Sequence, residues 1–178
     1  IFNAMFQILG VEGRFDLHSV PATQLAECVE RLRTDGASGF AVTIPHKQNV
    51  TPFLAELTSA ASAIGAVNTI YLCDDKLIGD NTDAPGFLKD LNCFLANHQS
   101  STLAPHAHLP RAQVPGSAGV VNRQSSIVLG AGGSARAIVY ALLNNGWDVT
   151  VAARRIEQAG QLANSFTNYQ MNIADLNL

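Results

Sequence analysis

The chain has 178 residues, of which 47% are hydrophobic and 14% are charged, and its formal net charge is −3. This composition is typical of a globular protein, and the slight negative charge argues against nucleic-acid binding, which usually needs a basic surface. No apolar run approaches the roughly 20 residues that cross a bilayer. The three cysteines form no CxxC pair, so neither a zinc site nor a disulfide framework is indicated, and we expect a cytoplasmic protein with free thiols.

The first 96 residues predict a small α/β domain, because helical and strand-like patterns alternate with turn residues. In chain order, the patterns predict an apolar helix over 1–9, a short strand over 15–20, a helix that Thr23 caps, a buried parallel strand over 40–44, a helix over 49–63, strands over 67–72 and 76–79, and a helix over 85–95. Asp74 and Asp75 form the predicted turn between the last two strands.

Residues 97–124 differ in character, since they hold several Pro, Ser and Gly residues and little apolar periodicity. A loop of this length is uncommon inside a compact domain, so we interpret the stretch as a linker or insertion. His98, His106 and His108 lie in it, but their spacing matches no standard metal site. We therefore predict surface positions for these histidines and no bound metal.

After this stretch comes a pattern typical of dinucleotide binding. A buried-type strand over 126–129 leads into Gly130-x-Gly132-x-x-Ala135 and an apolar helix to about residue 145, followed by a strand over 149–152 and a helix over 156–166. Glycines allow the tight turn and the close approach of a diphosphate, which the N-terminus of the helix then holds. The predicted cofactor-binding residues of the loop are Gly130, Ala131, Gly132, Gly133, Ser134 and Ala135.

The end of the second strand of this pattern carries Arg154 and Arg155. Enzymes that use NAD usually have an acidic residue there, which binds the ribose 2′-hydroxyl. Guanidinium groups suit a 2′-phosphate instead, because they donate charge-assisted, fork-shaped hydrogen bonds. The pair predicts NADP as the cofactor, although a solvated basic strand end would look the same in sequence.

Three segments of the front domain carry polar residues at strand exits or helix entrances, where α/β proteins place ligands: 42–47, 64–69 and 79–87. They contain Lys47, Asn68 and Asp83. Together these side chains would suit a polyhydroxylated, anionic substrate, and the lysine could donate to an oxygen that becomes negative during carbonyl reduction. Each of the three taken alone could equally be an ordinary surface or capping residue.

In this order, the segments resemble the shikimate dehydrogenase family. The matching pieces are FNAMF at 2–6, VTIPHK at 42–47, GAVNT at 65–69, GDNTDAPGF at 79–87, GAGGSARA at 130–137 and AARRIEQAGQLA at 152–163. The resemblance covers the chain apart from 97–124. It implies the reversible, NADPH-dependent reduction of 3-dehydroshikimate to shikimate, in the chorismate pathway to aromatic amino acids.

The resemblance also implies roles for particular residues. Lys47 matches the catalytic lysine of the family and Asp83 its acid–base partner, while Thr43 and Asn68 match ligands for the hydroxyl groups of the substrate. Arg154 falls on the arginine of the family's Asn-Arg-Thr element, which holds the 2′-phosphate.

The predicted organisation is therefore a shikimate-binding catalytic domain over 1–96, a linker over 97–124 and the first half of a Rossmann-type NADP-binding domain over 125–178. The family's Ser-x-Ser-Pro element and its last segment have no counterpart here, so we expect a piece that lacks both ends and does not complete a turnover by itself. Ala153 and Arg155 replace the Asn and Thr of the cofactor element.

Three alternatives stay open at this point. One is a quinate/shikimate dehydrogenase that uses NAD, one is a non-catalytic paralogue that binds shikimate or NADP, and one is a truncated product without function. The expected partners are small molecules, with neither nucleic acid nor membrane, and the sequence leaves open whether the protein is a monomer or a homodimer.

Overall fold

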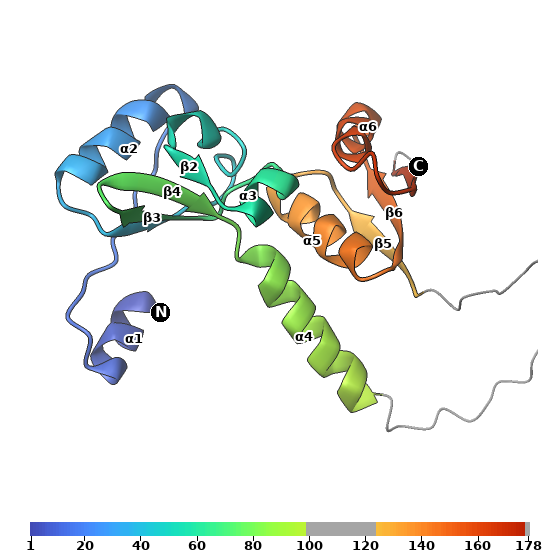
Figure 1. Cartoon of the computed structure of the whole chain (residues 1–178), viewed down its shortest axis with the longest axis horizontal. Coiled ribbons are helices and arrows are strands. Elements are labelled where there is room, and N and C mark those ends of the chain that lie inside the picture. Colours follow the sequence, from blue (N-terminus) through green and yellow to red (C-terminus); the bar gives the residue numbers. More distant parts are fainter. Residues whose placement is uncertain (99–123, 177–178) are drawn as a thin grey trace, which may run out of the picture.

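A computed structural model describes residues 1–98 and 124–176 and shows an α/β protein with two separate sheets (Figure 1). The front half holds a mixed four-stranded sheet, and the rear half holds a parallel three-stranded sheet. Helices α3 and α5 lie between the two sheets, and α4 begins beneath them and runs downward in the view (Figure 1). The predicted fold class is confirmed.

The front sheet has the strand order β1-β3-β4-β2. Its strands are β1 (Gly39–Ala41), β2 (Glu56–Leu57), β3 (Thr69–Cys73) and β4 (Lys76–Asp80). The β3–β4 hairpin turns at Asp74 and Asp75, whose φ angles are 49° and 59°. Two-residue hairpin turns of this hand need positive φ, and aspartate tolerates it better than most residues, so the predicted turn is confirmed.

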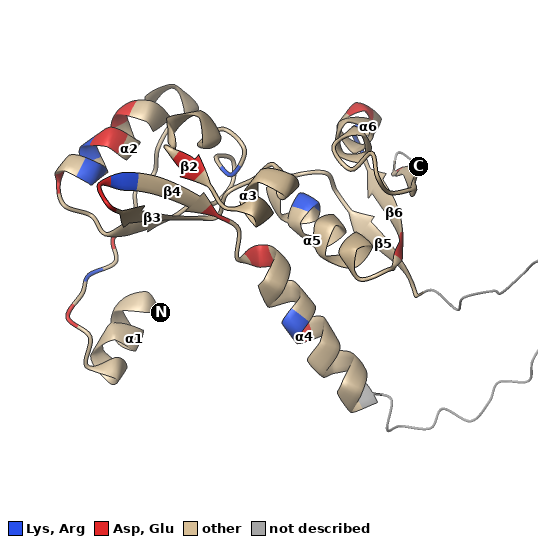
Figure 2. Ribbon diagram, viewed as in Figure 1, with Lys and Arg blue, Asp and Glu red and all other residues tan. Residues whose placement is uncertain are grey.

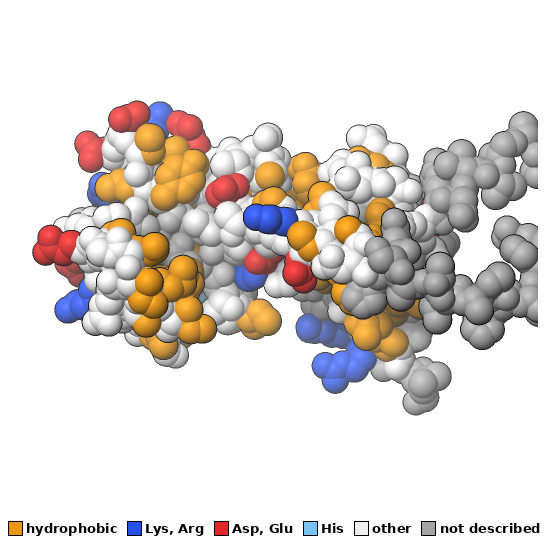
Figure 3. Space-filling view, turned by 90° about the horizontal axis from the view of Figure 1, so that it is seen from below, with side chains coloured by type: hydrophobic (Ala, Val, Ile, Leu, Met, Phe, Trp, Pro, Cys, Tyr) orange, Lys and Arg blue, Asp and Glu red, His pale blue; other side chains and the backbone are white. Residues whose placement is uncertain are grey.

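Three α-helices and two short 3₁₀ turns accompany this sheet: α1 (Phe2–Leu9), η1 (Ala22–Gln24), α2 (Leu25–Thr34), η2 (Thr51–Phe53) and α3 (Ser59–Ile64). Helix α2 turns Leu25 and Val29 toward the sheet. The buried core there consists of Leu25, Val29, Val50, Ala61, Val67, Ile70 and Leu77. Helix α1 buries none of its residues; hydrophobic side chains gather over it on the surface (Figure 3), among them Phe2, Met5, Ile8 and Leu9.

Four predictions for the front half are wrong. The run 40–44 is not a buried parallel strand, because only its start belongs to β1, which pairs antiparallel with β3 at the edge of the sheet. The segment 15–20 forms no strand, and Thr23 lies inside η1 instead of capping α2.

The fourth error is the helix over 49–63, which β2 interrupts. A Cβ at Gly79 would lie 2.6 Å from Leu54 and 2.8 Å from Leu57. The bare glycine thus lets these leucines pack against β4, and β2 pairs with that strand. Tertiary packing here outweighs a local helical pattern.

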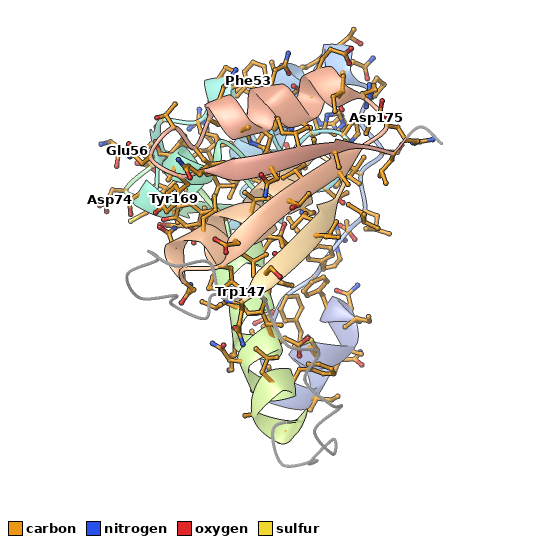
Figure 4. The ribbon with its side chains drawn as sticks, turned by 90° about the vertical axis from the view of Figure 1, so that its right-hand side faces the viewer. Phe53, Glu56, Asp74, Trp147, Tyr169 and Asp175 are labelled. Atoms are coloured by element: carbon orange, nitrogen blue, oxygen red, sulfur yellow. The ribbon has the colours of Figure 1, made fainter. Side chains whose placement is uncertain are left out.

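The rear sheet contains β5 (Ser125–Leu129), β6 (Asp148–Ala153) and β7 (Met171–Asp175), all parallel and in the order β5-β6-β7. Helices α5 (Gly133–Asn144) and α6 (Ile156–Asn164) connect them. Figure 4 shows the three strands side by side, with Asp175 at the carboxyl edge of the sheet and Trp147 at the opposite end near α4. This is the strand–helix–strand–helix–strand half of a dinucleotide fold. The sequence reading missed β7, whose residues have weak β propensity.

Helix α4 (Asp83–His98) joins the two halves. Its Phe87 packs against both the core of the rear sheet and a small mixed cluster. That cluster consists of Ile64, Ala66, Ala84, Ala137 and Ala141, from α3, α4 and α5 and the segment after α3. Alanines at the contact let helices approach closely, which sets the distance between the two sheets.

Most of the predicted linker, residues 99–123 with His106 and His108, lies outside the described residues; His98 is the last residue of α4. Among the helices that the structure describes, none is long and apolar enough to cross a membrane.

We predict that Leu162→Ala lowers the free energy of unfolding by about 2–5 kcal/mol, because Leu162 is fully buried in the core of the rear half and the change leaves a cavity. Urea denaturation would measure the effect. Leu17→Ala is the matched control, since Leu17 is 92% exposed and its loss should change stability little. Equal effects of the two substitutions would contradict the assigned core.

Candidate active site

Three segments of the front half meet at one edge of its sheet. The N–H of Val42 donates to the carbonyl of Asn68 at 2.8 Å, and the N–H of Asn68 donates to the carbonyl of Asp80 at 3.0 Å. The N–H of Val67 donates to the carbonyl of Lys47 at 2.7 Å. These backbone bonds bring together the segments 42–47, 64–69 and 79–87, whose polar residues the sequence analysis predicts to bind a ligand.

Their side chains form one connected polar group around the carboxylate of Asp83. Lys47 Nζ donates to Asp83 Oδ2 at 2.5 Å, and Asn68 Nδ2 donates to Asp83 Oδ1 at 2.7 Å. Side-chain exposure is 12% for Lys47 and 29% for Asp83. The ion pair is thus mostly shielded from water but keeps an open side, as a group that handles a small substrate needs.

Asp83 is held in place by its neighbour Asn81, which is 1% exposed. The Asn81 amide donates to the carbonyl of Ala66 at 2.9 Å, and its Oδ1 accepts from the N–H of Asp83 at 3.1 Å. A buried amide with both ends satisfied fixes the start of α4 against the segment before Asn68. The sequence analysis predicts no role for Asn81 of the GDNTD segment, because no local pattern signals that its side chain is buried.

Two further candidate residues lie at the edge of this group. Asn68 also bonds to Thr82, whose N–H donates to Asn68 Oδ1 at 2.9 Å, so the amide orientation of Asn68 is set from both sides. Thr43 is exposed, and its carbonyl accepts from the N–H of His46 at 2.8 Å. Within the described part of the chain its side chain makes no hydrogen bond, so its hydroxyl is available to a ligand.

The glycine-rich loop lies between β5 and α5. Gly130 has a φ of 99°, which favours glycine, and a Cβ at Gly132 would meet no atom within 4 Å. Helix α5 begins at Gly133 without a side-chain cap, so its first N–H groups have no intrahelical partner. Arg154 and Arg155 are exposed just after β6, and Figure 3 shows basic side chains projecting together from this half.

Lys47 connects the polar group to this loop. Its Nζ donates to Ser134 Oγ at 3.0 Å, and a Cβ at Gly133 would lie 2.9 Å from Lys47 Cβ. The lysine therefore packs directly on the start of α5 while it is paired with Asp83. The sequence predicts Ser134 as a cofactor-binding residue. In the structure its hydroxyl accepts a hydrogen bond from Lys47.

Comparison with known proteins gives the same family for the front half and the rear half of the chain. Residues 1–70 match the family model described as shikimate dehydrogenase substrate binding domain, and residues 115–178 match the one described as shikimate / quinate 5-dehydrogenase. The chain belongs to the shikimate dehydrogenase family.

Relatives carry the same name. A shikimate dehydrogenase (NADP(+)) of Methylocella silvestris is 37% identical over 93% of this chain and 52% of its own length. A crystal structure of a shikimate dehydrogenase with NADP+ aligns with a TM-score of 0.75 at 28% identity, covering 99% of this chain and 56% of that one. The Thermus thermophilus enzyme with NADP(H) and shikimate aligns with a TM-score of 0.71 at 29% identity, over 95% and 54%. The chain spans about half the length of the curated relatives that it matches.

In residues 1–98 and 124–176, no three His, Cys, Asp or Glu side chains are grouped so that they could hold a metal ion. Groups that could act on a ligand of the family include the ion pair, the amide of Asn68 and the N-terminus of α5.

Loss of the buried amide should destabilise the protein. We predict that Asn81→Ala lowers the free energy of unfolding by about 1–3 kcal/mol, because the Ala66 carbonyl and the Asp83 N–H lose their partner. Asn172→Ala, at an exposed position, is the control. Chemical denaturation measures both, and an Asn81 variant as stable as the control would show that the amide does not hold the segment.

Proposed function

We propose that this chain carries the substrate-binding part and the first part of the cofactor-binding part of an NADP-dependent shikimate dehydrogenase. The reaction is the reversible reduction of 3-dehydroshikimate to shikimate. The observation that carries the proposal is the shielded Lys47–Asp83 pair, which lies against the start of α5 in a chain of this family. The proposed division is 1–96 for substrate and 125–178 for cofactor, in a cytoplasmic enzyme.

The chain has groups that fit NADP. The uncapped N–H groups of α5 and the open space at Gly132 suit a diphosphate, which the positive end of the helix dipole attracts. Arg154 and Arg155, exposed at the carboxyl end of β6, suit a 2′-phosphate. When bound, the reduced cofactor supplies the hydride for the ketone carbon.

Lys47 would supply the proton. As the carbonyl carbon gains a hydride, its π electrons move to the oxygen, which becomes an alkoxide. The Lys47 ammonium donates a proton to that oxygen and is later reprotonated from solvent; in the oxidation direction the neutral amine removes the hydroxyl proton. Asp83 Oδ2 accepts a hydrogen bond from Lys47, so it orients the ammonium.

Asn68 and Thr43 would bind the hydroxyl groups of the substrate. The Asn68 amide is oriented by Asp83 and Thr82, so it presents a fixed pattern of donor and acceptor to a ligand beside the ion pair. The exposed Thr43 hydroxyl lies on the segment that leads to Lys47. Such fixed polar groups select a polyol by its pattern of hydroxyls.

A broader specificity is the second candidate. The description of the family model for residues 115–178 includes quinate, which differs from shikimate in its ring but carries similar hydroxyls. NADP reduction followed by nicotinamide absorbance, with shikimate and quinate and with NADP and NAD, separates the two. A protein that binds shikimate but reduces neither cofactor would instead be a non-catalytic paralogue.

We predict that Lys47→Ala in the full-length protein lowers kcat for shikimate oxidation by about 10²–10⁴-fold, the usual contribution of a general acid–base group. The KM for shikimate should change much less, since Asn68 and Thr43 remain. Lys89→Ala, an exposed lysine on α4, is the matched control and should leave kcat unchanged. Full turnover in the Lys47 variant would remove this lysine from the mechanism.

Cofactor choice can be tested separately. Arg154→Ala should lower kcat/KM with NADP roughly 10- to 100-fold, because a hydrogen bond to a charged group contributes about 1.5–3 kcal/mol. Activity with NAD should stay near its starting value, since NAD has no 2′-phosphate. Arg14→Ala, an exposed arginine in the front half, is the control. Parallel losses with both cofactors would rule out a 2′-phosphate contact.

A further inference from the structure

Arg136 crosses from the rear half to the front half of the molecule. It lies in the first turn of α5, and its Nε donates to the carbonyl of Ile64, the last residue of α3, at 2.7 Å. Its Nη2 donates to Ser165 Oγ at 2.8 Å, just after α6. One guanidinium thus links the start of α5 to the ends of α3 and α6. Figure 2 shows the basic segment of α5, in blue, at the end of the helix that lies near α3.

Among the described residues, no acidic side chain lies within ion-pair distance of Arg136. Partial burial lowers the pKa of the guanidinium. The Ile64 carbonyl lies at the end of α3, where the last carbonyls have no partner within the helix. The helix dipole also favours a positive charge at this end.

Gly65 is shaped to receive this side chain. Its φ of 68° ends α3 in the left-handed conformation, and a Cβ there would lie 2.8 Å from Arg136 Nη2. Any other residue at this position would push the guanidinium away from Ile64. The GAVNT segment therefore begins with a glycine that both the left-handed φ and the neighbouring guanidinium favour.

Both ends of this contact lead to the polar group. In the front half, Ile64 is followed along the chain by Ala66, whose carbonyl accepts from the Asn81 amide, and by Asn68, which donates to Asp83. On the rear side, Ser134 precedes Arg136 by two residues and bonds to Lys47. The position of α3 relative to α5 consequently sets where Asn68 and Asp83 lie relative to the cofactor loop.

We propose that Arg136 is a positioning residue that fixes the substrate-binding segment against the cofactor loop through the Ile64 carbonyl. The proposal rests on the proposed function, since the geometry that it sets is that of hydride and proton transfer. Arg136 touches neither Lys47 nor Asp83, so its effect on turnover passes through the placement of α3.

The test uses the full-length protein with Arg136→Gln and Arg136→Lys. Misplacement of reacting groups by about 1 Å can cost on the order of 10²-fold in rate, so kcat of the Gln variant should fall roughly 10- to 100-fold. The KM values for shikimate and NADP should stay close to those of the parent. Arg136→Lys keeps one charged donor for Ile64 and should recover part of the lost turnover. Ser165→Ala leaves the bond to Ile64 in place and removes only hydrogen bonds within the rear half, those of the Ser165 hydroxyl with Arg136 and with the Gln161 carbonyl, so it should have a smaller effect than Arg136→Gln.

Hydrogen exchange of the amides in 59–69 gives a second readout that needs no activity. Exchange should accelerate in the Arg136 variants and in Gly65→Ala, where the arginine remains but is displaced. Unchanged kcat in Arg136→Gln, or a raised KM for NADP with full kcat at saturation, would overturn the proposal; the latter would make Arg136 a cofactor contact. If Arg136→Gln does not fold, unchanged exchange in the Lys and Gly65 variants overturns it as well. A parent without shikimate activity refutes the proposed function alone, because exchange still tests the contact.

Discussion

The carboxylate of Asp83 accepts hydrogen bonds from Lys47 and Asn68, and three separate segments of the front half must be in place for those bonds to form. Asp83 is the first residue of α4, where a negative charge is favoured by the helix dipole, and the buried Asn81 amide holds its backbone. A charged group so shielded is costly unless it is paired, so the pair and its surroundings stabilise each other. The polar group is for this reason a fixed feature of the fold, and a ligand would meet it already assembled.

The contact between α3, α4 and α5 fixes the position of this polar group relative to the glycine-rich loop. Small side chains at the α3–α4–α5 contact, such as Ala84 and Ala137, bring the two sheets close enough for Lys47 to reach Ser134. Arg136 then ties the same elements from the other side through Ile64. The proposed hydride transfer would need this contact, because the proposed substrate and cofactor groups come from different halves of the chain.

Features with a local physical cause could be predicted from the sequence. The glycine loop, the Asp74–Asp75 turn and the polar residues at strand exits follow from backbone geometry and short-range patterns. The interruption of the 49–63 helix could not, because it depends on the space beside Gly79, which only the folded sheet reveals. The role of Arg136 was hidden for the same reason: the carbonyl that it binds is 72 residues away along the chain.

The proposed catalytic unit is the Lys47–Asp83 pair, and a double-mutant cycle can test whether the two residues act together. The measurement is kcat for shikimate oxidation with NADP in the full-length protein and its Lys47→Met, Asp83→Asn and doubly substituted forms. If the pair acts as a unit, the double variant should be about as slow as the slower single variant, because the second change removes a function that is already lost. Effects that multiply in the double variant would show that the two residues act independently and would contradict this account.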